Sequence, residues 1–238
     1  MKTRLTLILG ALALCAPLLG DTVDGALGLF TDHGDVGSVG KPGTVVYDAS
    51  RGTYTIGGAG ANMWAKADAM QFVWKRMSGN LSIAADIAFV SASTQPHRKA
   101  CLVIRQDLDP GSPYVDVAYH GSGLTSLQFR AVPGGMTKEI EAMTDSPTRV
   151  RLDRIGDQFY LSVVYGGAKP APSGASFTLH LKDPVYVGLA VCAHDDSAFE
   201  TAVFSRVRVG RASSDAAAPQ PGLHVMTLPT GDQRVTDK

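Results

Sequence analysis

From Trp64 to Val209 the chain is an almost unbroken series of short segments in which apolar and polar residues alternate. Turn residues separate these segments, and no window longer than a turn or two has the period of a helix. Alternation with a period of two is typical of antiparallel strands that pack one face in a core and expose the other to water. Many evenly spaced strands of this kind predict an all-β jelly-roll sandwich of two antiparallel sheets.

The alternation also separates the two faces of the predicted strands, because residues two apart share a face. The apolar members should be buried between the sheets: Leu102, Ile104, Val117, Leu127, Phe129, Leu189 and Val191. The intervening polar residues should project from one concave face. Together with Trp64, which follows a glycine-rich loop, they form our candidate ligand-binding site: Trp64, Lys99, Arg105, Asp116, His120, Gln128, Arg130 and His194.

This polar face has the chemistry to bind hydroxyl-rich ligands. Arginine supplies planar pairs of donors, and carboxamide, carboxylate and imidazole groups both accept and donate. The alternative is an ordinary solvated sheet surface. In the binding interpretation Arg105 and Arg130 are exposed, so truncating either one should weaken binding and change stability by less than about 0.5 kcal/mol.

The composition limits the class of partner. The 238 residues carry a formal net charge of +0, whereas a nucleic-acid-binding protein normally carries a basic patch. Hydrophobic residues make up 45% of the chain, which is enough for one real core. We therefore expect a single sandwich domain over residues 21–211 and no nucleic-acid partner.

The two ends of the chain differ from the middle. Lys2 and Arg4 precede a short apolar run that is typical of a cleaved export signal over residues 1–20, so we expect a periplasmic or secreted protein without a membrane span. Cys15 within that run is either a lipidation site or a residue lost with the signal. Residues 212–238 read as a linker followed by a hairpin around a Thr-Gly-Asp turn.

Complete catalytic motifs are missing. Glycoside hydrolysis needs two carboxylates at one bond, and glutamate occurs only at Glu139, Glu141 and Glu200. Glu139 and Glu141 would share a face of a strand about 7 Å apart, but the Glu-x-Asp-x-x-Glu pattern of laminarinase-type glucanases is not present. There is also no Gly-x-Ser-x-Gly elbow. We therefore expect a protein that is not an enzyme, with the glutamate pair on a solvated strand edge.

Metal sites are weakly indicated. Calcium prefers oxygen ligands from loops, and two loops are rich in aspartate, around Asp107 and Asp109 and at Asp195-Asp196. Because loops are commonly rich in aspartate, we expect no cofactor and keep calcium as the alternative. Three histidines lack short ligand spacing but could be gathered by the strands: His97, His120 and His194.

Two cysteines remain beyond the signal, Cys101 and Cys192, and both fall on the polar side of their strands. An exported protein is free to form a disulfide, yet ordinary strand pairing suits disulfide geometry poorly. A bridge and two free thiols therefore remain the alternatives.

Several segments occur in an order that resembles a known family. They are Trp64 with Asp68, Phe72-Val-Trp-Lys-Arg-Met-Ser-Gly79, Lys99-Ala-Cys-Leu-Val-Ile-Arg105, Tyr186-Val-Gly-Leu-Ala-Val-Cys-Ala-His194 and Ala202-Val-Phe204. Over roughly residues 30–210 the chain is similar to the concanavalin A-like jelly-roll domains of the "regulation of enolase protein" type, which have no established activity. Cys101 and Val103 stand where many members carry Gly and Met. The resemblance implies the fold and no particular chemistry.

A second resemblance concerns the tail. Leu223-His-Val-Met-Thr-Leu-Pro-Thr-Gly-Asp232 looks like the opening strand pair of a TolB-like β-propeller, and relatives of this jelly roll occur fused ahead of such propellers. Our hypothesis is an exported, non-catalytic module that binds carbohydrate or another envelope polymer. The alternatives are a structural or protein-interaction domain associated with a TolB-like propeller and a glycoside hydrolase.

Overall fold

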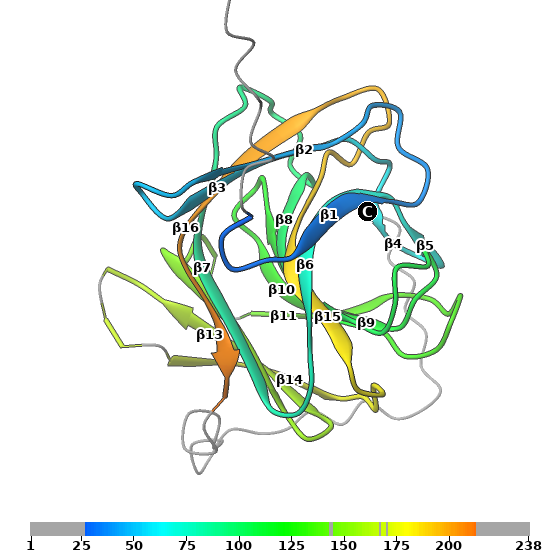
Figure 1. The fold of residues 1–238 in the computed structure, drawn as a ribbon, viewed down its shortest axis with the longest axis vertical. Coiled ribbons are helices and arrows are strands. Elements are labelled where there is room, and N and C mark those ends of the chain that lie inside the picture. The colour runs from blue at the N-terminus through cyan, green and yellow to red at the C-terminus, as the bar shows by residue number, and fades with distance from the viewer. Residues whose placement is uncertain (1–26, 143–144, 167, 170, 213–238) are drawn as a thin grey trace, which may run out of the picture.

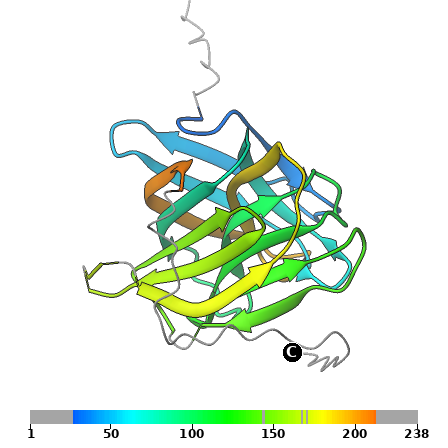
Figure 2. The same cartoon turned by 90° about the horizontal axis from the view of Figure 1, so that it is seen from below.

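The computed structural model describes residues 27–142, 145–166, 168–169 and 171–212, and this part of the chain forms strands and no helix. Two seven-stranded antiparallel sheets make up most of this described part (Figures 1 and 2). In spatial order, sheet A consists of β1 (Asp32–Val36), β6 (Met70–Met77), β15 (Val185–Cys192), β8 (Lys99–Arg105), β9 (Tyr114–His120), β10 (Thr125–Arg130) and β11 (Lys138–Glu141).

Sheet B packs against sheet A. Its strands, in spatial order, are β14 (Ala171–Thr178), β13 (Gln158–Val164), β12 (Arg149–Ile155), β7 (Leu81–Phe89), β16 (Glu200–Arg211), β3 (Thr53–Gly58) and β2 (Thr44–Asp48). A separate short pair is formed by β4 (Met63–Trp64) and β5 (Ala67–Asp68). The predicted all-β jelly-roll sandwich is confirmed.

The core lies between the two sheets and follows the alternation of the sequence. Leu102 lies opposite Leu189 on β15 and Val117 on β9, and Val117 in turn lies opposite Leu127. All seven apolar residues that we predicted to be buried belong to this core. Fully burying one such side chain contributes about 1.5–3 kcal/mol, so this row fixes which face of each strand points inward.

One strand differs from its prediction. The alternation predicts a strand at residues 177–181, whereas β14 begins at Ala171 and ends at Thr178. The alternation does not predict the first half of β14, because Pro172 and Gly174 both weaken the sequence signal of a strand. The structure tolerates Pro172 because β14 is an edge strand, where a missing N–H interrupts no ladder on the open side.

Residues 59–69, which connect β3 to β6, pack on the outer face of sheet A and are called the covering segment, or cover, below. Met63 from this segment joins Met70, Phe72, Trp74 and Cys101 in a second hydrophobic cluster outside the main core. Figure 1 shows β4 and β5 beside the green loops that join β8 to β9 and β10 to β11. Backbone hydrogen bonds tie the cover to both loops, from Asp68 N to Pro110 O and from Thr137 N to Ala65 O.

Gly60 lets this covering segment fold back on itself. Its φ is +111°, and a Cβ atom placed there would lie 2.1 Å from the carbonyl oxygen of Ala69. A larger residue would therefore meet both backbone strain and a backbone clash. The glycine-rich loop that precedes Trp64 thus allows the backbone at Gly60 to pack closely against the backbone at Ala69.

Four expectations concern residues outside the described ranges: the export signal at residues 1–20, the fate of Cys15, the linker beyond residue 212 and the hairpin that resembles a propeller opening. Within the described ranges, no helix is long and apolar enough to cross a membrane.

Candidate functional site

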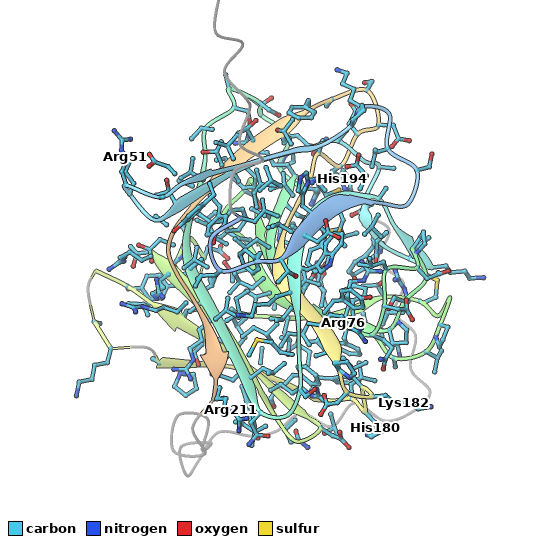
Figure 3. The ribbon with its side chains drawn as sticks, in the orientation of Figure 1. Arg51, Arg76, His180, Lys182, His194 and Arg211 are labelled. Carbon is cyan, nitrogen blue, oxygen red and sulfur yellow. The ribbon has the colours of Figure 1, made fainter. Side chains whose placement is uncertain are left out.

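The strand register places the predicted site residues of β8, β9 and β10 on the outer face of sheet A. Lys99 lies opposite His120, Gln128 lies opposite Asp116, and Arg105 and Arg130 both lie opposite Tyr114. His194 lies two residues after the end of β15, in the upper half of Figure 3, whereas Lys182, which precedes β15, lies in the lower half. The covering segment then divides this face into a buried part and an open part.

Arg105 and Arg130 lie in the buried part, so the expectation that they are exposed is wrong. Both side chains are 0% exposed and converge on the carboxylate of Asp68 in β5. Arg130 forms a bidentate pair with Asp68, at 2.7 Å (Nη2 to Oδ1) and 2.9 Å (Nη1 to Oδ2). Arg105 Nη2 lies 3.5 Å from Asp68 Oδ2. Planar guanidinium groups paired to one carboxylate hold the covering segment on the sheet.

Both arginines also donate to backbone carbonyl oxygens, although Arg105 Nη1 has no hydrogen-bond partner among the described residues. Arg130 donates to the carbonyl oxygens of Pro110, Ser112 and Gly135, at 3.0, 3.1 and 3.1 Å. Arg105 donates to the carbonyl oxygens of Asp107 and Asp109, at 2.7 and 2.6 Å. These bonds reach the β8–β9 and β10–β11 loops. The two arginines therefore organise the cover and are not available to a ligand.

Asp116 is a second correction to the expected surface. Its side chain is 0% exposed, and neither carboxylate oxygen has a hydrogen-bond partner among the described residues. Burial raises its pKa to about 8, although the nearby Lys99 ammonium acts in the opposite direction. A carboxyl group in this setting is protonated near neutral pH and is not a ligand contact.

The open part of the face is a pocket of about 130 Å³ between the end of β15 and the edge strand β11. Four of the predicted residues line it, namely Trp64, Lys99, Gln128 and His194, and the other contributors are Asn62, His97, Leu124, Glu139 and Glu141. The pocket thus combines one half-buried aromatic ring with amide, imidazole, ammonium and carboxylate groups. His120 does not line the pocket.

Lys99 forms the floor of this pocket and is almost fully buried. Its ammonium group donates to Asn62 Oδ1 at 2.9 Å, to the Met63 carbonyl oxygen at 2.9 Å and to Gln128 Oε1 at 3.2 Å. It also lies 5.2 Å from the ring centroid of Trp64, within the range of a cation–π contact. All three of its protons are therefore used to hold the pocket wall.

Three histidines gather at the β15 side of the pocket. The His97 ring lies 5.3 Å from that of His194 and 6.3 Å from that of His120. His120 Nδ1 lies 3.0 Å from the Leu124 carbonyl oxygen, which can only accept, so Nδ1 carries the proton of the neutral ring. Burial, with a further contribution from Lys99, lowers the pKa of His120 to about 3. Burial also lowers the pKa of His194.

The aspartates of the two candidate calcium loops accept hydrogen bonds within their own turns. Asp195 Oδ1 accepts hydrogen bonds from Ser197 N and Oγ, and Asp109 Oδ1 accepts one from Gly111 N. These carboxylates therefore stabilise turns. Across the described ranges, no group of three or more His, Cys, Asp or Glu side chains is arranged to hold a metal ion.

Cys101 and Cys192 are both free and buried under the covering segment. Cys101 lies opposite Ala190, and Cys192 lies opposite Lys99, so the two are not direct cross-strand partners. Burial raises the pKa of Cys192 to about 11, which keeps its thiol protonated and unreactive near neutral pH.

Several pocket residues carried too little sequence signal to be assigned to the site. Glu139 and Glu141 looked like a solvated strand edge, although the predicted strand and their shared face are both present in β11. Asn62, His97 and Leu124 lie in segments outside the strands, where alternation says nothing about direction. One sequence signal could have indicated this side of the pocket: Glu139 and Glu141 lie two residues apart, so both side chains lie on the same face of a strand.

No family model matches the sequence, and no curated protein is significantly similar to it. Solved structures are similar in fold. A functionally unknown protein from Saccharomyces cerevisiae has 13% identity and a TM-score of 0.56, over 74% of this chain and 95% of the yeast protein.

Two further structures have lower TM-scores. Arcelin-5, a lectin-like defence protein from Phaseolus vulgaris, has 9% identity and a TM-score of 0.47, over 71% of this chain and 91% of its own. A pseudo β-1,3-glucanase and immunostimulatory antigen of Mycobacterium tuberculosis has 15% identity and a TM-score of 0.46, over 77% of this chain and 99% of its own. At these identities the likeness concerns the fold alone, and the described part of this chain is an all-β jelly-roll sandwich of two antiparallel sheets.

Proposed function

We propose that this chain is an exported, non-catalytic module of the "regulation of enolase protein" type that binds carbohydrate, or another hydroxyl-rich envelope polymer, in the pocket beside Trp64. The observation that carries the proposal is the combination in one pocket of a partly exposed indole ring with Gln128, Glu139, Glu141 and His194. The apolar face of a sugar ring packs on an indole, and its hydroxyl groups need nearby donors and acceptors.

The size of the pocket limits what it holds. Sites for drug-sized ligands typically enclose about 300–1,000 Å³. A volume of about 130 Å³ suits a single sugar unit, with the rest of a polymer outside. Lys99 fixes Gln128 and the Asn62–Met63 segment before any ligand arrives, so little ordering is needed on binding.

Trp64→Ala should lower the affinity for a bound oligosaccharide by about thirtyfold or more, because the loss of a central aromatic anchor commonly costs about 2 kcal/mol or more. Intrinsic tryptophan fluorescence and calorimetric titration of a glycan found on an array of envelope and plant oligosaccharides would measure this loss. The backbone carbonyl of Trp64, which accepts from Arg130, is unchanged by the substitution.

Tyr165→Ala is the matched control, since it removes an exposed aromatic ring that does not line the pocket. It should leave the affinity within about twofold of wild type, which is the scale of a surface substitution. Equal affinities for wild type and Trp64→Ala, or no binding to any glycan on the array, would count against the proposal. Release of shortened products from a bound oligosaccharide would contradict the non-catalytic part and favour the glycoside hydrolase alternative.

A second candidate is the protein-interaction domain associated with a TolB-like propeller. The observation in its favour is a pair of exposed apolar side chains on the β10–β11 loop, Val132 (60% exposed) and Met136 (41% exposed). Exposed apolar groups that lie close together can mark a contact with another protein. If the glycan array is negative, co-purification of the chain with a propeller protein, lost in Val132→Ser with Met136→Ser, would favour this candidate.

A further inference from the structure

The charged groups of the pocket are unbalanced. Among the described residues that line it, two are carboxylates, Glu139 and Glu141, and one is a lysine, while none is an arginine. Lys99 donates its three protons to Asn62, Met63 and Gln128 and retains none for a ligand. The lysine therefore lies at the floor with its protons committed to protein acceptors, whereas the two carboxylates lie on the β11 side of the pocket.

The two glutamates are placed to act together. They lie two residues apart on β11, so they share a face, and their Cα atoms are about 7 Å apart. Glu139 Oε2 accepts one hydrogen bond, from Gln128 Nε2 at 3.2 Å. Glu141 has no side-chain hydrogen bond within the described part of the chain and is exposed at the edge of the pocket. Both carboxylates thus have acceptor capacity left for a group with several N–H donors.

An anionic sugar does not fit this arrangement. The carboxylate of a uronic acid would approach two negative glutamates and would find no lysine proton free. Burial lowers the pKa of His194, which keeps that imidazole from supplying a positive charge near neutral pH. Like charges at short distance disfavour binding. A neutral sugar fits sterically, but its hydroxyl groups use only part of the acceptor strength of two carboxylates.

We propose that the sugar unit bound in this pocket carries a free, protonated amino group. This group donates hydrogen bonds to Glu139 and Glu141 at the β11 edge, while the sugar ring packs on Trp64. The natural ligand class is a polymer or glycan that contains deacetylated hexosamine. This inference rests on the proposed function, because it uses the same pocket and specifies its substrate.

Calorimetric titration of the full chain with three tetrasaccharides at pH 6 tests the inference. They are the tetramers of glucosamine (the deacetylated tetramer), of N-acetylglucosamine (the N-acetylated tetramer) and of galacturonate (the uronate). We expect the deacetylated tetramer to bind about tenfold more tightly than the N-acetylated one, because the extra free energy of a hydrogen bond to a charged group corresponds to about a tenfold change in Kd. We expect no measurable binding of the uronate. Raising the pH until the amine is neutral should abolish the preference.

Glu141→Gln should lower the affinity for the deacetylated tetramer by about tenfold and reduce the preference over the N-acetylated tetramer, because the amide keeps the shape and loses the charge. Asp157→Asn is the matched control, as it removes one negative charge from the β12–β13 turn of sheet B. Thermal unfolding of both variants should match wild type.

The outcomes separate the two proposals. Equal affinity for the deacetylated and N-acetylated tetramers, or preference for the uronate, would overturn the inference and leave carbohydrate binding intact. An unchanged preference in Glu141→Gln would also overturn it. If no tetrasaccharide binds while another glycan on the array does, the inference alone is overturned, and if no glycan binds at all, the proposed function fails with it.

Discussion

Arg130→Ala should lower the free energy of unfolding by about 3–5 kcal/mol, the usual cost of removing one partner from a buried ion pair. The substitution leaves the Asp68 carboxylate buried beside Arg105, whose closest approach to it is 3.5 Å. It also removes the donors to the carbonyl oxygens of Pro110 and Ser112. The expectation reverses the small stability change predicted when Arg130 was assigned to an exposed face.

Urea unfolding followed by circular dichroism measures this loss. Arg51→Ala is the control, because the Arg51 side chain is 80% exposed and its removal should change stability by less than about 0.5 kcal/mol. Arg130→Lys should fall between wild type and Arg130→Ala, since lysine keeps the charge and loses the bidentate geometry. Unfolding midpoints for Arg130→Ala that coincide with wild type would show that the cover does not depend on this pair.

Asp116→Asn should stabilise the protein progressively as the pH rises. The amide resembles the protonated carboxyl group in shape and stays neutral at every pH. Relative to wild type, we expect the free energy of unfolding of the variant to increase by about 2–4 kcal/mol between pH 5 and pH 8, because each tenfold difference in proton affinity between the folded and unfolded states corresponds to about 1.4 kcal/mol.

The sign follows from the two pKa values of Asp116. Burial raises its folded-state pKa to about 8, above the ordinary value of 3.8. Between these values the folded state binds a proton that the unfolded state releases, so the stability of wild type falls as the pH rises through this window. Above about pH 8 the carboxylate is ionised in both states and the full cost is present. The asparagine variant has no such dependence.

Urea unfolding of both proteins at intervals from pH 5 to pH 8.5 would measure the difference. His120 acts in the opposite direction, since burial lowers its pKa to about 3 and the unfolded state binds more protons below its ordinary value of 6.5. That contribution is common to both proteins and cancels in the comparison. A difference that stays constant with pH would mean that Asp116 is ionised in the folded state and has a partner.

These two residues show why the polar face of sheet A has two parts. Arg105 and Arg130 pair with Asp68 and so hold the covering segment on the sheet, and Asp116 is fully buried on the same face. Trp64 and Gln128 lie on the same side of the sheet and line an open pocket. A row of polar residues on a strand therefore marks either a ligand site or the underside of a covering loop, and the two have opposite consequences for stability.

The sequence by itself determined the sandwich and the direction of its side chains. The alternation in Lys99–Arg105, Tyr114–His120 and Thr125–Arg130 assigned the core face correctly, because a shift of one residue would expose every apolar side chain of the strand. Edge strands such as β14 were less visible, since Pro172 and Gly174 interrupt the pattern where pairing on one side is not needed.

Only the tertiary structure decided which polar residues meet water. Asp68 and Arg130 are 62 residues apart, and their pairing depends on how the glycine-rich segment folds back at Gly60. Glu139 and Glu141 became part of the pocket because β11 pairs with β10 at the edge of sheet A. Parity along a strand determines direction alone, whereas burial depends on contacts between segments that are distant in the sequence.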